Sequence, residues 1–524
     1  MMQGRVQTMF GCDIRSLAAF RIGIGILLFV DAFVRYGAAE AFYSGEGFMN
    51  AALAQSLSPD GYSLNYLSDS VAFQRLVFLS LACSAFLLCI GCFTRTATFC
   101  CWVLLASVHV RNPAYIIGGD TLMRLLLFWS LFAPLGSAWS IDHRRRRRKD
   151  NAKDRESIAG GFVCSVGTAC LLLQVCVMYV TAGLSKWNDP WLTGIAMDFI
   201  LRQDCYARPL SGWLVQFPTL TSLMSYATLF IELVVPFLLF LPYKTAHLRL
   251  AGVAFFWAFH LGIALTMDVG KFTYVCMVAW LLFLPSIFWN RFQWAQLSRV
   301  SSRSSAVEGD AGVVRLKHAA RRLVCGVLPA LLFSYVIVWN FAGLYGWPGN
   351  TWMSHNPDVF YRFGNAVMLK QNFHLFGRPA RANTTFLFSG QAASGEELDL
   401  VRGTLASETG PGASLPEAQA WKTLHWYLIS FGGQTKLYDS LVEYHARNWN
   451  RTADGAHQVH EARLELFAED MGPGIEAGSF IHLRNVAEWR DPTWDMDSDD
   501  RLKQQFEEMM NRMENGGLFP VGSD

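Results

Sequence analysis

Residues 13–31 read DIRSLAAFRIGIGILLFVD, and this stretch decides the fold class. Its apolar part is long enough to cross ~30 Å of hydrocarbon as a helix of about 20 residues. It carries Arg21 and Asp31 and has no short apolar region followed by small cleavage-site residues, which argues against a cleaved signal peptide. We therefore expect a helix that stays in the membrane.

Apolar stretches of similar length recur through the first two-thirds of the chain. The composition agrees, because 52% of the 524 residues are hydrophobic and 16% are charged, whereas soluble proteins carry roughly 25% charged residues. The predicted fold is an all-α polytopic membrane bundle with a transmembrane domain over residues 1–345. We predict nine spans, near residues 17–34, 71–91, 97–115, 119–138, 159–182, 221–241, 248–267, 272–290 and 323–341.

From about residue 350 the composition becomes that of a soluble protein, which predicts a second domain over residues 346–524. The stretches ANTTFLFSG (382–390) and ARLELFAED (462–470) alternate like strands, and the turn-like GQAASGEE separates the first of them from LDLV. Residues 417–446 and 498–515 have helical periodicity. We expect a small soluble α+β domain.

Lysine and arginine residues follow the positive-inside pattern, which sets the orientation. With a cytoplasmic N-terminus, the cytoplasmic segments contain the basic run Arg144–Lys149. A nucleic-acid site is a poor explanation of this run, because basic clusters beside membrane helices attract anionic lipid. Nine spans then place the C-terminal domain on the extracytoplasmic side. The other basic residues of the cytoplasmic segments are Arg5, Arg15, Arg95, Lys153, Arg155, Lys244, Arg249, Arg291, Arg299, Arg303, Arg315, Lys317, Arg321 and Arg322, against Arg111, Lys186, Arg202, Arg208 and Lys271 in the outer loops.

The cysteine residues give no sign of a metal site or of disulfides in the C-terminal domain. Most of the 12 cysteines lie within or beside apolar stretches, where cysteine acts as a small apolar residue. None follows Cys325, and no Cys/His spacing is typical of a metal site. Cys12 and Cys205 lie in polar segments that we predict on opposite sides of the membrane.

Charged residues inside membrane helices are costly, so each needs a partner or a function. Asp31 and Arg35 are spaced i,i+4, as are Asp120 and Arg124, and the spacing predicts an ion pair within each helix.

Two further ionisable residues lie in apolar stretches without a charged neighbour in sequence. Glu232, in FIELVVPF, needs a partner from another helix. His260 follows the aromatic run FFWAF, and it is either a hydrogen-bonded packing residue or a functional one.

Three polar segments are predicted at the outer ends of helices: RNPAYIIGGD (111–120), GLSKWNDPW (183–191) and MDVGKF (267–272). Together they would form a site at the membrane surface. Lys186 lies beside Trp187, where partial desolvation disfavours a charged ammonium group and favours a base. The other interpretation is an interfacial lysine whose side chain extends to the lipid headgroups.

Four regions of the chain resemble the horizontally transferred transmembrane (HTTM) domain family, which includes the vitamin K-dependent gamma-glutamyl carboxylases. They are residues 13–31 with AFYSGEGF (41–48), then AGLSKWNDPWLTG (182–194), FHLGIALTMDVGKFTYV (259–275) and NFAGLYGW (340–347). The resemblance implies carboxylation of glutamate side chains in a secreted peptide or protein. This reaction would be coupled to oxidation of reduced vitamin K, or another membrane quinol, to its epoxide, with oxygen and carbon dioxide as co-substrates.

The resemblance also implies roles for individual residues. Lys186 matches the active-site lysine of the carboxylases. Those enzymes carry a catalytic histidine where this chain has Pro113, so this catalytic element is either missing here or supplied from elsewhere, with His260 as the candidate. The implied cofactor-binding residues are Asn112, Trp187, Gly270, Leu344 and Tyr345.

Two other classes of function are weighed against the carboxylase. A non-enzymatic HTTM membrane protein that assists export or maturation of a secreted peptide is favoured by Pro113. Lys186, Tyr345 and the FH…G.F.YV pattern favour the enzyme. A transporter is the weakest interpretation, because the sequence has no inverted repeat and no matching pair of broken helices.

The basic residues generate a prediction about topology. A membrane-impermeant thiol reagent applied to intact cells should label a cysteine introduced at Ser479 but not one introduced at Ser157. Each cysteine is introduced singly, and labelling of the unmodified protein is the background. The reverse labelling pattern would contradict the predicted orientation.

Overall fold

The computed structural model describes residues 2–149, 161–292, 322–342, 358–406, 419–430, 435–470 and 480–491. Packing divides the chain into two units. The helical unit comprises Met1–Asn383, Glu417–Gly432 and Glu469–Ser479, and the sheet unit comprises the rest of the chain. The predicted boundary at 345/346 lies outside the described residues.

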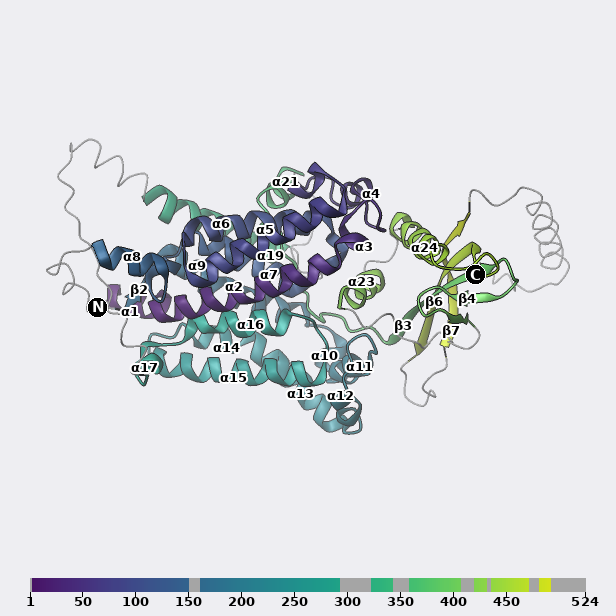
Figure 1. The fold of residues 1–524 in the computed structure, drawn as a ribbon. Coiled ribbons are helices and arrows are strands. Elements are labelled where there is room, and N and C mark those ends of the chain that lie inside the picture. The colour runs from purple at the N-terminus through teal and green to yellow at the C-terminus, as the bar shows by residue number, and fades with distance from the viewer. Residues whose placement is uncertain are drawn as a thin grey trace. The chain divides into compact units, whose positions relative to one another are not determined.

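The helical unit contains a helix at each of the nine predicted spans (Figure 1). Six are long and apolar enough to cross a membrane: α2 (Ile14–Gly37), α5 (Val71–Ile90), α9 (Val166–Ser185), α13 with α14 (Pro218–Leu238), α15 (Thr245–Thr266) and η7 with α19 (Leu323–Phe341). The other three predicted spans hold shorter or less apolar helices, α6 (Thr94–Arg111), α7 (Gly118–Ser130) and α16 (Phe272–Trp280) with η5 (Leu281–Phe283). The chain is therefore a multi-pass helical protein, and nine full crossings remain a prediction.

Helix α7 shows why length alone does not decide the role of a segment. It has 13 residues, or about 20 Å of helix, and all of them from Gly119 onward are buried. A helix surrounded by protein need not match the thickness of the bilayer, because its neighbours, and not lipid, cover its surface.

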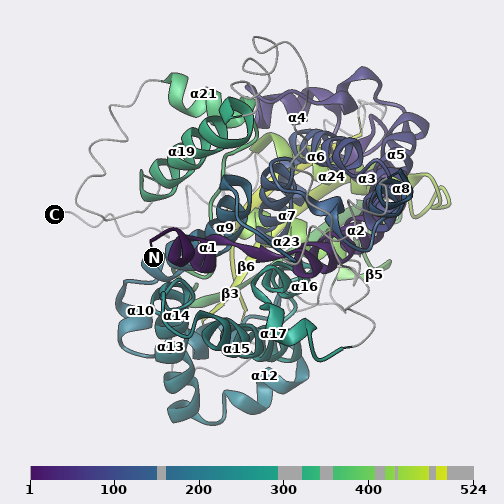
Figure 2. The ribbon, with the colours of Figure 1, turned by 90° about the vertical axis from the view of Figure 1, so that its left-hand side faces the viewer.

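The remaining helices connect these spans and cover their ends (Figure 2). They are α1 (Met2–Phe10), α3 (Ala39–Tyr43), α4 (Ala51–Leu57), η1 (Leu64–Leu67), η2 (Pro113–Tyr115), η3 (Leu135–Ser137), α8 (Ile141–Lys149), α10 (Asp189–Leu192), α11 (Ala196–Arg202), α12 (Pro209–Leu214), α17 (Ser286–Trp289), α21 (Asp358–Ala366) and α23 (Gln419–Ser430).

Segments assigned to the same side by the alternation of spans do meet at the same end of the helices. At one end, β1 (Cys12–Asp13) pairs with β2 (Phe162–Val163), and the amide of Asp142 donates to the carbonyl of Gly91 at 3.0 Å. We call this the Cys12 end and the opposite one the Lys186 end.

Helix α15 connects these two ends. Near its start, Arg249 Nη1 donates to the carbonyl of Gly11 at 2.9 Å. Just after it finishes, the amide of Asp268 donates to the carbonyl of Tyr206 at 2.7 Å. Cys12 and Cys205 therefore lie at opposite ends, as predicted, while their sides of the membrane remain a prediction.

Arg21, in the stretch that decides the fold class, is fully buried and has a structural role. Its guanidinium donates to three backbone carbonyls, those of Leu135 (3.2 Å), Ala138 (3.1 Å) and Trp139 (2.7 Å). Gly91, which ends α5 with φ +68°, lies directly against it, and a Cβ there would come within 2.7 Å of Nη1. The guanidinium of Arg21 thus anchors the segment between α7 and α8 to helix α2.

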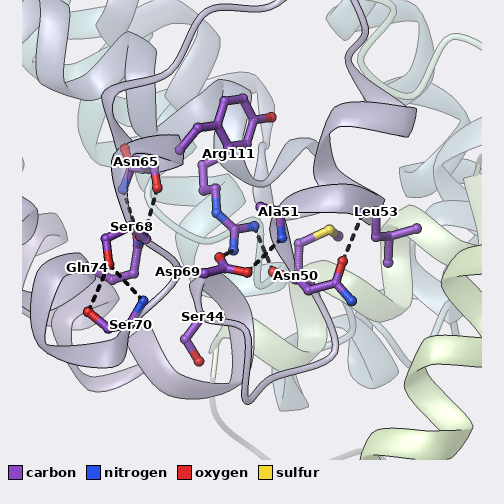
Figure 3. A network of polar contacts seen from close by, with 12 residues as sticks. Ser44, Asn50, Ala51, Leu53, Asn65, Ser68, Asp69, Ser70, Gln74 and Arg111 are labelled. Carbon is purple, nitrogen blue, oxygen red and sulfur yellow. Dashed lines mark hydrogen bonds and ion pairs between the residues drawn. The ribbon is translucent and has the colours of Figure 1, made fainter.

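The loop between α2 and α5 is held by Arg111 at the end of α6 (Figure 3). Arg111 Nη1 donates to the carbonyl of Met49 at 2.7 Å, and Nη2 donates to Asp69 Oδ1 at 2.6 Å. Asp69 Oδ2 also accepts the amide of Ala51 at 3.1 Å. One buried guanidinium therefore holds two parts of this loop.

The sheet unit confirms the predicted strands. Strands β3 (Ala382–Ala392) and β6 (Val459–Asp470) cover both predicted stretches, and β4 (Glu397–Asp399), β5 (Thr404–Leu405) and β7 (Phe480–Arg490) complete a sheet of order β5-β4-β3-β6-β7. Helix α24 (Thr435–Asn450) packs on it, with His445 4.5 Å from Phe388 between ring centroids.

The prediction of one helix over residues 417–446 is wrong. The segment holds α23 in the helical unit and α24 in the sheet unit. Gly432 and Gly433 lie between them in sequence, and glycine is a poor helix former. The helix predicted at 498–515 lies outside the described residues.

We predict that Arg111→Met lowers the free energy of unfolding by roughly 2–3 kcal/mol, because it removes two hydrogen bonds and leaves the carbonyl of Met49 buried without a donor. Unfolding by sodium dodecyl sulfate in mixed micelles, followed by tryptophan fluorescence, measures this. The exposed Arg95→Met is the control and should change stability little. Equal effects of both substitutions would show that the loop does not depend on Arg111.

Candidate functional site

Lys186 is the C-cap residue of α9, and its side chain turns into the protein. The side chain is 2% exposed, and Nζ lies 2.8 Å from Glu232 Oε2 on α13. Nζ also donates to Glu232 Oε1 at 3.2 Å and to the carbonyl of Ala182 at 3.3 Å. The interpretation of Lys186 as a surface lysine reaching the headgroups is therefore wrong, and the partner that Glu232 needed is Lys186.

Local sequence explains how this pair forms. Gly183 lies one turn before Lys186, and a Cβ there would come within 2.8 Å of Leu233 Cδ2 and 3.1 Å of Glu232 Cβ. The glycine lets α13 approach α9 closely. Trp191 on α10 covers the lysine, with Nζ 5.2 Å from its ring centroid, a distance at which a cation is attracted to the ring face.

His260 lies in a second polar group on α15. Its Nε2 is 2.5 Å from the hydroxyl of Tyr179 on α9, which also accepts a hydrogen bond from Trp280 Nε1 at 2.9 Å. His260 is fully buried, and its Nδ1 has no hydrogen-bond partner among the described residues. Tyr179 and Lys186 lie two turns apart on one face of α9, about 10 Å along the axis. Among the described residues, the hydrogen bonds of Lys186 go to Glu232 and Ala182, and that of His260 goes to Tyr179.

A charge network at the Lys186 end joins three helices. Arg35 on α2 binds Asp31 (2.9 Å) and Asp120 on α7 (2.5 Å). Lys271, beside α16, binds Asp120 (2.6 Å) and also Asp31. The predicted Asp31–Arg35 pair is confirmed.

The predicted Asp120–Arg124 pair is wrong. Arg124 instead donates to the carbonyls of Met368 (3.1 Å) and Lys370 (2.7 Å), and its Nη1 lies 3.1 Å from His109 Nδ1. Asp120 is held by cations on other helices, which the spacing within α7 could not reveal.

The other expected cofactor residues are placed as follows. Asn112 is buried, and it donates to the carbonyl of Phe42 (2.7 Å) and accepts the amide of Tyr115 (3.1 Å), so both its polar groups are used. Trp187 is 67% exposed. Gly270 lies between α15 and α16 with φ +60°. Leu344 and Tyr345 lie outside the described residues.

Sequence reasoning missed a segment after α21, residues 367–381, which we call the strap. It packs into the helical unit, where Leu369 and Phe373 join the main core. Gln174 Nε2 on α9 donates to Gln371 Oε1 at 2.8 Å, and Trp339 Nε1 donates to the carbonyl of Gln371 at 2.7 Å.

Farther along, the strap lies against the segment that carries Lys186. Trp191 Nε1 donates to the carbonyl of Phe376 at 2.9 Å, and Asn188 Nδ2 donates to that of Gly377 at 2.6 Å. The sequence MLKQNF has no helical periodicity, so its amide groups would have no partners within a helix. This was the only sign in the sequence that the segment forms hydrogen bonds with other parts of the chain.

The sequence model of the HTTM domain matches residues 11–288 of this chain. The chain belongs to the HTTM domain family. No solved structure matches the chain. The HTTM domain contains Lys186, Glu232, His260 and the charge network, whereas the strap follows it.

The geometry generates a prediction about which charges interact. A double-mutant cycle between Asp120→Asn and Lys271→Met should give a coupling energy of at least ~1 kcal/mol, because the two side chains touch. The cycle between Asp120→Asn and Arg124→Met should give a smaller one, under ~0.5 kcal/mol. Unfolding of the full-length protein in mixed micelles provides both numbers. A larger coupling in the second cycle would restore the pair within α7.

Proposed function

We propose that this HTTM protein is a vitamin K-dependent gamma-carboxylase-like enzyme that carboxylates glutamate side chains of a peptide or protein, with coupled oxidation of a membrane quinol. The observation that carries the proposal is the buried Lys186–Glu232 pair, with Nζ 2.8 Å from Oε2. By the sequence resemblance, Lys186 occupies the position of the active-site lysine of the carboxylases. Lys186 acts as the base in this proposal.

The pair gives Lys186 a route to the neutral form. Burial disfavours both charges, and a buried ion pair is stable only when its two members compensate each other closely. Transfer of a proton from Nζ to the Glu232 carboxylate, whose Oε1 accepts its hydrogen bond at 3.2 Å, leaves both groups neutral. The free amine of Lys186 then accepts a proton from a ligand hydroxyl, which is the work of a general base.

The surroundings of His260 support a quinol contact, because its fully buried Nδ1 has no hydrogen-bond partner among the residues that the structure describes. The rings of Phe259 and Phe272 lie 5.4 and 5.9 Å from that imidazole between centroids and provide apolar walls. In this proposal Nδ1 of His260 holds a quinol oxygen. When bound, a reduced quinone supplies on oxidation by oxygen the strong base that removes a glutamate γ-proton before carbon dioxide adds.

The expected cofactor residues take different parts in this proposal. Asn112 acts through the loop that it holds, since its own polar groups are used. Trp187 provides an exposed aromatic surface, and Gly270 sets the turn before α16. Leu344 and Tyr345 are retained as quinol contacts on the resemblance alone.

A second candidate is a non-enzymatic role in export or maturation of a secreted peptide. Pro113 favours it, because it begins the short helix η2 at the position where the carboxylases carry a catalytic histidine. The proline has no side-chain donor or acceptor to offer a reaction.

Purified full-length protein in nanodiscs tests the enzyme. With a reduced quinone, oxygen and labelled bicarbonate, it should incorporate label into a glutamate-rich peptide. Lys186→Ala and Lys186→Arg should each lower the rate at least ~100-fold, because the first removes the base and the second leaves a guanidinium that stays protonated. Glu232→Gln should lower it about tenfold or more, because Lys186 loses its proton acceptor.

The matched control is Lys244→Arg, an exposed lysine at the Cys12 end that should keep full activity. A Lys186→Arg variant with near-normal incorporation would remove Lys186 from the role of base. Wild-type protein that folds but incorporates no label with any reduced quinone would favour the non-enzymatic role.

A further inference from the structure

Tyr179, on α9, connects side chains from two other helices through one hydroxyl group. Trp280 Nε1, on α16, donates to this hydroxyl oxygen at 2.9 Å, and Nε2 of His260, on α15, lies 2.5 Å from it. All three side chains are buried, with Tyr179 3% exposed and the other two 0% exposed. Three helices therefore meet at one oxygen atom inside the protein.

The ring of Phe256 holds this arrangement in place. It stacks on Trp280, with 3.9 Å between ring centroids and an interplanar angle of 16°, and its centroid lies 4.6 Å from that of Tyr179. Phe256 precedes His260 by one turn of α15. The helix that carries the imidazole thus also positions the two rings that form the hydrogen-bond chain to it.

The direction of the bond between Tyr179 and His260 follows from counting donors. The indole nitrogen of Trp280 can only donate, so the hydroxyl oxygen of Tyr179 accepts from it. The hydroxyl has one hydrogen of its own, which needs an acceptor. Among the described residues, the groups that face it are Nε2 of His260, at 2.5 Å, and the thiol of Cys276, whose sulfur is a weak acceptor. The imidazole nitrogen is therefore the acceptor.

The opposite direction is less favourable. If Nε2 of His260 carried the proton, the oxygen of Tyr179 would accept two hydrogen bonds, and its own hydrogen would have only a sulfur atom to bind. In the chain from Trp280 through Tyr179 to His260, the hydroxyl accepts one bond and donates the next. Hydrogen bonds in such a chain polarise and strengthen one another.

The imidazole of His260 is neutral in this arrangement. Protons on both nitrogens would make it a fully buried cation, which is costly without an anion in contact. No carboxylate of the described residues lies within ion-pair distance of it. A neutral imidazole carries one proton, and since Nε2 accepts from Tyr179, that proton lies on Nδ1.

We propose that Tyr179 is a positioning residue, whose hydroxyl fixes His260 as the tautomer protonated on Nδ1, so that His260 is a hydrogen-bond donor there and not a base. The tautomer follows from the buried side chains alone, whereas its use toward a quinol oxygen rests on the proposed function. The donor at Nδ1 holds the oxygen, and removal of a proton is left to Lys186, two turns farther along α9.

Magnetic resonance of isotope-labelled histidine tests the tautomer without any substrate. Full-length protein with labelled histidine is reconstituted in nanodiscs, and each ring nitrogen is correlated with its neighbouring ring carbons, which separates Nδ1 from Nε2. The signal of His260 is the one that disappears in His260→Gln. It should show a protonated Nδ1 and an unprotonated Nε2.

Tyr179→Phe removes the hydroxyl and keeps the ring, so Nε2 of His260 loses its donor. The ratio of the Nδ1–H form to the Nε2–H form should then fall at least ~tenfold, as expected for the loss of one hydrogen bond. Cys276→Ala should leave the ratio unchanged, because the thiol is not the acceptor. The matched control is Tyr335→Phe on α19, whose hydroxyl donates to the carbonyl of Phe360 at 2.8 Å and does not reach the imidazole.

The carboxylation assay connects the tautomer with the reaction. Tyr179→Phe should raise the KM for the reduced quinone about tenfold and change kcat less, because it weakens the binding of the quinol oxygen and leaves the base intact. Tyr335→Phe should keep both constants. Thermal unfolding of each variant shows that it is folded.

A wild-type His260 protonated on Nε2, or on both nitrogens, would overturn the proposal. So would a folded Tyr179→Phe variant that keeps the wild-type ratio, or one that changes the ratio and keeps the wild-type KM. If Tyr179→Phe does not fold, the wild-type spectrum still decides the tautomer, and a changed ratio in Cys276→Ala would overturn the assigned acceptor. The expected tautomer in a protein that incorporates no label with any reduced quinone would support the role of Tyr179 in fixing it and refute the enzyme.

Discussion

A charge inside an apolar helix bundle must meet an opposite charge or several backbone dipoles, and this constraint fixes the arrangement of the helical unit. Arg35, Asp31, Asp120 and Lys271 join α2, α7 and the start of α16 in one network. Lys186 and Glu232 join α9 to α13 in the same manner. Each pair between helices forms only at one relative position of the two helices. A shift by one turn, about 5.4 Å, would separate the charges, and an unpaired buried charge costs several kcal/mol.

Hydropathy and spacing predicted the helices well because these signals are local. Each predicted span holds a helix, and the pair Asp31–Arg35 forms as the i,i+4 rule indicates. The same rule failed for Asp120, since neighbouring helices bring Arg35 and Lys271 to it and these cations compete with Arg124. Lys186 and Glu232 each lacked a local partner in the sequence. Their opposite charges were a usable signal, but 46 residues separate them, and nothing local shows that their helices touch.

The strap was beyond prediction for a different reason. Its interactions are mostly to backbone carbonyls, as at Met368, Lys370 and Phe376, and every residue type offers a backbone carbonyl. Residue type therefore does not reveal which residues make these carbonyl contacts. Arg124 and Trp191 provide the donors, and Arg124 was assigned from sequence to an ion pair with Asp120.

The surroundings of Lys186 bear directly on what the lysine can do. The side-chain nitrogen of Lys186 contacts the carboxylate of Glu232 and donates to the carbonyl of Ala182 in the last turn of α9. Proximity to tryptophans, the reason inferred from sequence, is therefore only part of the environment of this lysine. In the proposed reaction the proton of Lys186 goes to an acceptor within reach, and the Glu232 carboxylate, which accepts a hydrogen bond from Nζ through Oε1 at 3.2 Å, is such an acceptor. Base chemistry at Lys186 consequently belongs to the pair, and Gly183, which lets the two helices approach, is part of the same requirement.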